Sequence, residues 1–219
     1  MPARLRPTAP IAADAVLVGD PGRALMLAQA LLEQPKMSNH ARGLWGYSGQ
    51  APDGHELSIQ ATGMGGPSAA LVLADLAELG VRRAIRVGTC TALDPSLAAG
   101  QLLAITEAHA WGSGGTGERV AADARLAEAL AAELGDAARP ATVASLDTLH
   151  GGGAPAPVAA GDAADMQTAT LFSRGRQLGV ELAAVLIVTA SASGEQLADE
   201  AGEAVATRAG TAASAALSG

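Results

Sequence analysis

Residues 81–91 read VRRAIRVGTCT, a short apolar run that ends in a glycine turn. Arg86 lies inside the apolar run, where a charge without a partner would be costly. Gly88 and Thr89 follow it directly. A buried strand that carries one guanidinium to a glycine turn and a hydroxyl group is typical of an anion-binding site. The stretch therefore predicts a buried strand with an anion site at its carboxyl end.

Two earlier stretches show the same succession of an apolar run, a glycine turn and a predicted helix. GDPGR (19–23) follows the apolar residues 15–18, and GMGGPS (63–68) follows a second apolar run. Glycine lets the backbone come close to an anion, and arginine offers a planar fork that matches phosphate oxygens. We therefore expect the glycine turns to converge, together with Arg23 and Arg86, on one oxyanion pocket at the ends of buried strands.

Strand and helix patterns alternate along the whole chain. The predicted strands cover 15–18, 85–87, 102–107, 143–146 and 180–189, with a hairpin over 43–61 whose turn is Pro52-Asp53-Gly54. The predicted helices cover 23–32, 68–79, 123–134, 165–178 and 195–217. The predicted irregular segments are an extended arm over 1–14 and loops over 111–118 and 150–162. This alternation predicts an α/β protein with a largely parallel central sheet.

The composition excludes several classes of protein. A hydrophobic content of 49% with a mean hydropathy of +0.24 favours a globular protein, and no apolar run approaches the roughly 20 residues of a membrane span. The net charge of −8 argues against nucleic acid as a partner. The N-terminal residues lack the apolar core of a secretory signal, and the single cysteine fits a reducing compartment. We therefore expect a cytoplasmic protein.

Several stretches together resemble one known family. They are VGDPGRA (18–24), NHARGLWGYSG (39–49), TGMGGPSAALVLADLAELG (62–80), RVGTC (86–90), TALDPSLAAGQLL (91–103) and ADMQTATLF (164–172). In this order they resemble the nucleoside phosphorylases of the hexameric bacterial type, which include purine nucleoside phosphorylases and uridine phosphorylases. The resemblance implies one domain over 1–219, folded as a three-layer α/β/α sandwich around a mixed, partly barrel-like sheet. It also implies cleavage of a nucleoside by inorganic phosphate to a free base and a pentose 1-phosphate.

The resemblance assigns a complete set of phosphate ligands. Gly19 resembles the family glycine whose backbone N–H meets the phosphate, and Arg23 resembles the arginine that clamps it. Arg86 and Thr89 resemble the arginine and the hydroxyl that complete the site, with Thr89 in place of the commoner serine. Arg42 resembles an arginine that a neighbouring subunit donates. Phosphate is thus the expected co-substrate, and no spacing of His, Cys, Asp and Glu predicts a metal site.

The segment that binds the sugar departs from the family pattern. Met64 resembles the methionine beneath the ribose, and Met166 the methionine beside it. The family's Glu-Met-Glu segment is here Asp165-Met166-Gln167. Gln167 accepts hydrogen bonds but carries no negative charge toward a cationic sugar, and its amide N–H groups need partners of their own. Recovery of activity in a Gln167→Glu variant would identify the missing charge as the defect.

The segments on the base side depart further. Ser191 occupies the position of the aspartic acid that protonates a departing purine, and it is a weak proton donor. His150 is a titratable group that could donate in its place. Leu149 replaces the aromatic residue that stacks on the base, and Thr91 replaces a glycine beside it. Cys90, next to Thr91 at the base side, has no histidine partner in the sequence, and we interpret it as packing.

Two functions of different classes stay open at this point. The first is an active nucleoside phosphorylase with an altered base or sugar preference. The second is a catalytically weak or inactive paralogue that binds a nucleoside or phosphate ligand, or completes the site of an active partner subunit. Hydrolysis by water is disfavoured, because a nucleosidase needs no phosphate site. The resemblance implies a dimer-based homo-oligomer such as a hexamer, with the hairpin 43–61 (Trp45, Tyr47) as a candidate dimer contact.

Overall fold

The computed structural model describes residues 4–111, 115–149 and 161–219. Its strands are β1 (Asp14–Val18), β2 (Glu33–Asn39), β3 (Gly46–Gln50), β4 (Glu56–Ala61), β5 (Arg83–Ala92), β6 (Leu102–Ala110), β7 (Glu118–Ala121), β8 (Ala138–Ser145), β9 (Ala163–Asp165) and β10 (Glu181–Ala190). Its α-helices are α1 (Pro21–Leu31), α2 (Gly65–Glu78), α3 (Ala124–Leu134), α4 (Thr168–Leu178) and α5 (Asp199–Ser218). Short 3₁₀ turns cover Ala41–Gly43 and Gly135–Ala137.

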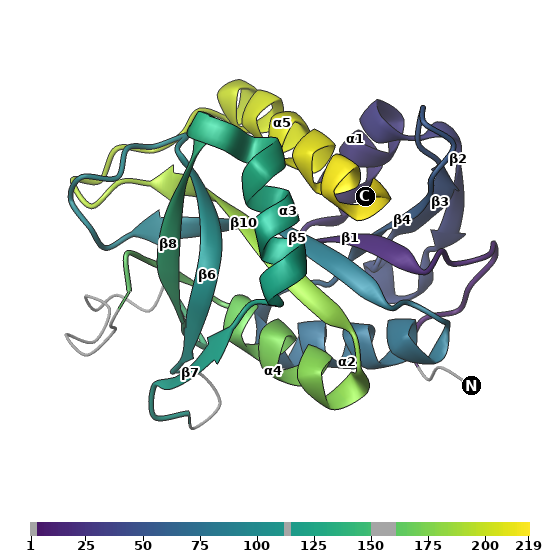
Figure 1. The fold of residues 1–219 in the computed structure, drawn as a ribbon, viewed down its shortest axis with the longest axis horizontal. Helices are drawn as coiled ribbons and strands as arrows, with labels where there is room; N and C mark the ends of the chain where they lie inside the picture. The colour runs from purple at the N-terminus through teal and green to yellow at the C-terminus, as the bar shows by residue number, and fades with distance from the viewer. Residues whose placement is uncertain (1–3, 112–114, 150–160) are drawn as a thin grey trace.

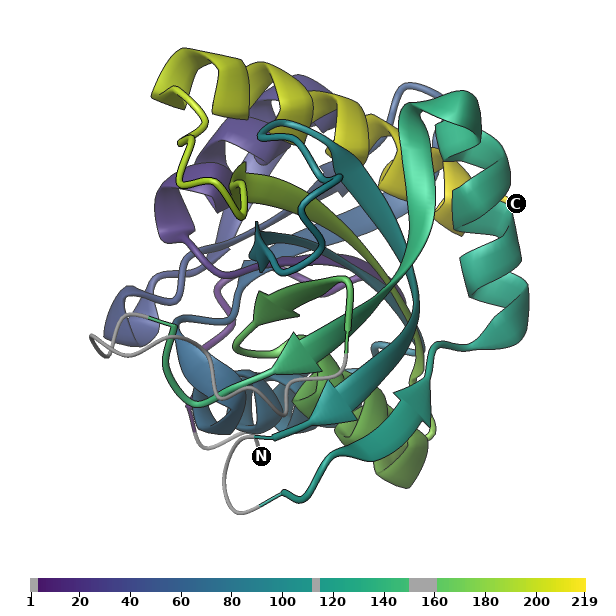
Figure 2. The same cartoon turned by 90° about the vertical axis from the view of Figure 1, so that its left-hand side faces the viewer.

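Strand β5 organises the sheet. It pairs in parallel with β1 and with β10, and at Thr91 and Ala92 it pairs in antiparallel fashion with β9. The path β10–β6–β8–β9–β5 closes on itself through the β10–β5 pairing, whereas β1, β4, β3 and β2 continue from β5 as an open sheet. Figure 2 shows the curved strands of the closed part. The predicted mixed and partly barrel-like sheet is thereby confirmed.

Helices cover both faces of this sheet, as the three-layer prediction requires. Helices α2 and α4 pack together on one face, and α1, α3 and α5 lie on the other (Figure 1). The Asp20 carboxylate caps α1 by accepting the Arg23 N–H at 2.8 Å, and Pro21 opens the helix. Gly179 ends α4 with a φ of +69°. Each predicted helix is present, although α4 begins at Thr168 rather than 165 and α5 at Asp199 rather than 195.

Three strands were not predicted. Strand β2 contains Pro35 and is mostly exposed, because it lies at the end of the open sheet, where only one side needs backbone partners. Strands β7 and β9 have only four and three residues, too few to show an alternating pattern. Strand β9 occupies the boundary between the predicted loop 150–162 and the predicted helix from 165. Residues 150–160 of that loop lie outside the described residues.

From Arg4 onward, the predicted N-terminal arm lies against the body of the protein. The backbone N–H groups of Arg4 and Leu5 donate to the buried Asp75 carboxylate at 2.6 and 2.8 Å. The Arg6 N–H donates to the Asn39 side-chain oxygen at 2.8 Å. Leu5 itself is only 1% exposed and belongs to the core on the α2 side of the sheet. The arm therefore forms part of the folded structure.

Replacing Asp75 with alanine is expected to lower the free energy of unfolding by about 1–3 kcal/mol, because the arm's backbone donors would lose their buried acceptor. Urea denaturation measures the change. The matched control is Glu128→Ala, which removes an exposed carboxylate from α3 and should shift the free energy by no more than about 0.5 kcal/mol. Equal values for the two variants would show that the arm contributes nothing to stability.

Within the described residues, no helix is both long and apolar enough to cross a membrane.

Candidate active site

The glycine turns after β1 and β4 lie beside Gly88 of β5 at one edge of the sheet. Gly88 lies inside the strand and not in the predicted turn, because β5 stays paired with β10 as far as Thr91. Val18 at the end of β1 pairs with Ala61 at the end of β4, and Leu17 pairs with Arg86 of β5. Gly19 therefore lies between Gly63 and Gly88, and a Cβ atom on Gly19 would stand 3.5 Å from the Gly63 carbonyl oxygen. The carboxyl edge of parallel strands is where open α/β sheets bind ligands.

The backbone of β5 opens at this edge. Its ladder to β1 runs only as far as Arg86, and its ladder to β9 begins at Thr91. On this side, among the described residues, no strand pairs with the segment from Gly88 to Cys90. The gap between the two ladders leaves room for a ligand next to Gly88 and Thr89.

A cavity of about 530 Å³ occupies this position. The residues that line it come from the turns after β1 and β4, from β5, and from the segments that follow β8 and β9: Gly19, Asp20, Pro21, Arg23, Gly63, Met64, Gly65, Arg86, Gly88, Thr89, Leu149, Met166 and Gln167. Residues predicted to bind phosphate and residues predicted to bind the nucleoside thus line the same cavity. Met64 is 88% exposed, so a ligand in the cavity would find an apolar surface at its rim.

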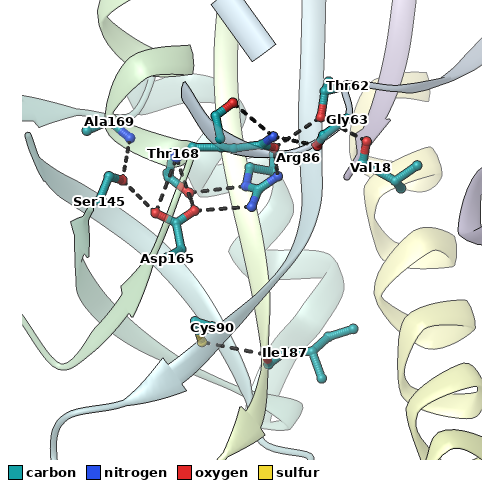
Figure 3. Close-up of polar contacts among 12 residues, drawn as sticks. Val18, Thr62, Gly63, Arg86, Cys90, Ser145, Asp165, Thr168, Ala169 and Ile187 are labelled. Carbon is teal, nitrogen blue, oxygen red and sulfur yellow. Dashed lines mark hydrogen bonds and ion pairs between the residues drawn. The ribbon is translucent and has the colours of Figure 1, made fainter. Parts of the chain in front are cut away.

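Arg86 is buried and held on three sides. Its Nη1 donates to the Gln167 side-chain oxygen at 2.6 Å, its Nη2 to the Asp165 carboxylate at 3.1 Å and its Nε to the Thr168 hydroxyl at 3.2 Å (Figure 3). Because Asp165 is only 1% exposed, the two charges neutralise one another in the interior. The guanidinium carries further N–H groups beyond these three. Since Arg86 lines the cavity, those groups are suited to an anion there.

Gly88 makes room for this guanidinium. The side chain of Arg86 lies over the backbone of Gly88, two residues later on the same strand. A Cβ atom on Gly88 would lie 2.6 Å from Cζ of Arg86, 2.7 Å from Nη2 and 2.8 Å from Nε. Any side chain at this position would therefore displace the guanidinium.

Asp165 holds Arg86 through a second set of contacts that sequence reasoning missed. Its carboxylate accepts the Ser145 hydroxyl at 2.5 Å and the Thr168 hydroxyl at 2.5 Å, as well as the Thr168 backbone N–H at 3.0 Å. The Asp165–Thr168 contact could have been predicted, because an aspartate three residues before a threonine at a helix start resembles a helix-capping pattern. The Ser145 contact left no such signal in the sequence, because Ser145 comes from β8, twenty residues away. Asp165 does not line the cavity.

Arg23 faces the same cavity from the first turn of α1. Burial lowers the pKa of its guanidinium, the nearby Asp20 carboxylate raises it, and the positive charge of Arg86 lowers it further. Arg23 and Arg86 are thus close enough to repel one another, while Asp20 is the acidic residue among those that line the cavity. An anion between the two arginines would relieve that repulsion.

Other predicted site residues lie apart from the cavity. Cys90 points its sulfur at the Ile187 carbonyl oxygen, 3.6 Å away, and burial raises the pKa of its thiol, which agrees with packing. Figure 3 shows this contact well separated from the Arg86 contacts. Thr91 is paired with Ala164 of β9. The Ser191 hydroxyl lies 2.9 Å from that of Ser193 and does not line the cavity.

Arg42 and His150 were predicted to belong to the site. Arg42 is exposed in the turn after β2, with a φ of +61° that is uncommon for a residue with a side chain, and it does not line the cavity of its own chain. His150 lies outside the described residues. Across the described residues, no group of three or more His, Cys, Asp or Glu side chains could hold a metal ion.

The comparisons with known proteins agree with this architecture. The family model of the phosphorylase superfamily matches residues 14–219. A DeoD-type purine nucleoside phosphorylase of Alkaliphilus metalliredigens is 30% identical over 195 residues, which cover 83% of each chain. A DeoD-type purine nucleoside phosphorylase of Oceanobacillus iheyensis is 44% identical over 84 residues, which span only 38% of this chain and 35% of that protein.

Solved structures show the same fold. Purine nucleoside phosphorylase from Toxoplasma gondii, in complex with immucillin-H, matches with a TM-score of 0.83 at 22% identity, over 94% of this chain and 91% of that one. A uridine phosphorylase structure from Phytophthora capsici also gives 0.83, at 21% identity, over 100% and 94%. The family model matches residues 14–219, and one relative is 30% identical along most of both chains. The chain therefore belongs to the phosphorylase superfamily, among the nucleoside phosphorylases.

Proposed function

We propose that the protein cleaves the glycosidic bond of a nucleoside with inorganic phosphate. A phosphate oxygen attacks the anomeric carbon, the carbon–nitrogen bond breaks with its electron pair going to the base, and a pentose 1-phosphate forms. The base gains a proton, and Ser191 and His150 stay predictions for its donor. The observation that carries this proposal is the meeting of Arg23, Arg86 and Thr89 in one cavity with two apolar methionines at its wall.

The proposed roles follow from the chemistry of the transition state. The sugar becomes cationic as the base departs, so a phosphate held directly beneath it both attacks and stabilises it. Arg23, Arg86, Thr89 and the Gly19 backbone would hold the phosphate. Met64 and Met166 would pack against the sugar, and Leu149 would lie on the base side. The proposal includes no metal and no cofactor, with phosphate as the co-substrate, and it places the enzyme in the cytoplasm.

The test is a panel of purine and pyrimidine nucleosides, each incubated with and without phosphate while release of free base is followed. We expect release that depends on phosphate. Arg23→Ala should raise the KM for phosphate about 10- to 100-fold, because one of the two charged ligands from its own chain is lost at little cost to the fold. Base release that is equally fast without phosphate would point to hydrolysis, and no release from any nucleoside would point to the binding paralogue.

The position of Arg42 supports the partner role left open by the sequence. Arg42 is exposed and does not line its own cavity, which leaves it free for the site of a neighbouring copy, so we infer a homo-oligomer built on dimers. Neither Arg23→Ala nor Arg42→Ala alone should be fully active. Mixing the two and reassembling them should restore about a quarter of wild-type activity, since half of the random dimers are mixed and have one intact site. No restoration would show that Arg42 acts within its own chain, or not at all.

A further inference from the structure

Gln167 lines the proposed sugar wall, yet its side chain is already surrounded by polar partners within the protein. Its oxygen accepts the Arg86 guanidinium at 2.6 Å and lies 3.0 Å from the Thr62 hydroxyl, whose single proton is shared with the Val18 carbonyl oxygen at 2.9 Å. Its nitrogen donates to the carbonyl oxygens of Gly63 at 2.7 Å and Gly65 at 3.2 Å. A carboxamide has two N–H donors and two acceptor lone pairs, and a polar protein atom lies within hydrogen-bond distance of each of the four. Gln167 is also buried, with only 3% of its surface exposed.

These bonds cross-link three parts of the site. Gln167 stands at the start of α4, Gly63 and Gly65 form the turn between β4 and α2, and Arg86 comes from β5. A glutamate could not replace it with the same contacts, because a carboxylate has no N–H to offer the two carbonyl oxygens. The side chain is matched to these partners rather than to a ligand.

The sugar hydroxyl nearest to Gln167 follows from the proposed reaction. Phosphate held by Arg86 lies directly below the anomeric carbon, and in ribose the 2-hydroxyl points from the adjacent carbon toward that same side. Gln167 is bonded to Arg86 itself, so it stands next to the position of the 2-hydroxyl. Met64 and Met166, which also line the cavity, have no strong hydrogen-bonding group. Of the polar side chains in the lining, Arg23, Arg86 and Thr89 are assigned to the phosphate, and the Asp20 carboxylate caps α1.

We propose that Gln167 is a positioning residue that ties the Gly63–Gly65 turn to Arg86, and that the sugar wall therefore selects 2-deoxyribose over ribose. A hydroxyl that leaves water without gaining a partner weakens binding by about tenfold. The inference rests on the proposed function, because it requires the pentose to lie above an Arg86-bound phosphate. It names the substrate class as 2′-deoxynucleosides.

The decisive measurement compares the binding of α-D-ribose 1-phosphate and 2-deoxy-α-D-ribose 1-phosphate by calorimetry. The two ligands differ by one hydroxyl, and no bond is broken, so the greater chemical lability of deoxynucleosides does not enter. We expect the deoxy sugar to bind about tenfold more tightly. Equal binding, or tighter binding of the ribose compound, overturns the inference while leaving the phosphorylase function standing. If inorganic phosphate and both sugar phosphates fail to bind, the proposed function itself fails.

Two variants separate positioning from sugar recognition. Gln167→Met is close in size but has no polar hydrogen-bonding group, so it should weaken inorganic phosphate binding about tenfold, through Arg86, and keep the deoxy preference. Gln167→Glu repels the two carbonyl oxygens and should turn a free acceptor toward the sugar, shifting the ribose-to-deoxyribose binding ratio at least about fivefold toward ribose. Gln29→Glu, the same change at an exposed position on α1, is the control and should alter neither value. A Gln167→Glu variant with an unchanged ratio would contradict the inference.

Discussion

Replacing Arg86 with alanine is expected to reduce phosphate-dependent base release by at least about a thousandfold and to lower the free energy of unfolding by about 3–5 kcal/mol. The two effects have different causes. The first is the loss of a charged phosphate ligand at the cavity. The second is the loss of the cation that pairs with Asp165, a carboxylate that is only 1% exposed and that would remain buried with its charge unpaired.

A double variant separates these effects. Arg86→Ala combined with Asp165→Asn removes both charges, so denaturant unfolding should show part of the lost stability restored, while base release should stay absent. Both proteins are measured beside the wild type by urea denaturation and by phosphate calorimetry. Phosphate binding within twofold of the wild type in the single variant would contradict the assignment of Arg86 as a phosphate ligand. Equal stability of the single and double variants would contradict the buried ion pair.

Gly88→Ala is expected to lower phosphate affinity and kcat/KM about 100-fold, although it introduces only one methyl group. The new Cβ would lie 2.6–2.8 Å from three guanidinium atoms of Arg86, closer than real contacts allow. The guanidinium must therefore move, and a shift of about 1 Å in a group that positions a reactant costs on the order of 10²-fold in rate. The variant tests the placement of Arg86 rather than its presence.

The control for this substitution is Gly202→Ala on α5. There the nearest atom to a new Cβ is 3.7 Å away, an ordinary contact, and alanine favours a helix. Phosphate affinity and turnover should match the wild type, and stability should not fall. Wild-type affinity in Gly88→Ala would show that Arg86 does not need its observed position to bind phosphate.

Hydrophobic patterning was enough to predict the helices, because each buries one stripe of side chains at helical spacing against the sheet. Leu27 and Leu31 of α1, for example, are both buried in the core beside α5. The pattern missed β2, whose polar residues Glu33 and Lys36 face solvent at the end of the sheet. Edge strands need no continuous apolar side, so their sequences carry a weak signal.

Glycine-rich motifs were enough to bring Gly19, Arg23, Arg86 and Thr89 to one place. Two of the motifs follow parallel strands, which end at a shared edge, and the third lies inside β5 beside them, so local sequence located the anion site. The same reasoning did not place Arg42, whose predicted function needs a second subunit. It also linked Ser191 to the base, and that role stays a prediction; in the structure the hydroxyl contacts Ser193 and the Glu195 backbone N–H in the turn after β10.

By itself, the sequence determined the helices, the strands with a clear apolar pattern, the family, and the residues that surround the anion site, because these depend on local spacing and on short motifs. Only the tertiary structure decided which partners the polar side chains take. Arg86 meets Asp165, and Gln167 meets Thr62, Gly63 and Gly65, across about 80 to 105 intervening positions of the chain. Those bonds depend on the β9–β5 pairing, which brings Asp165 and the start of α4 beside β5, and no local pattern records that pairing.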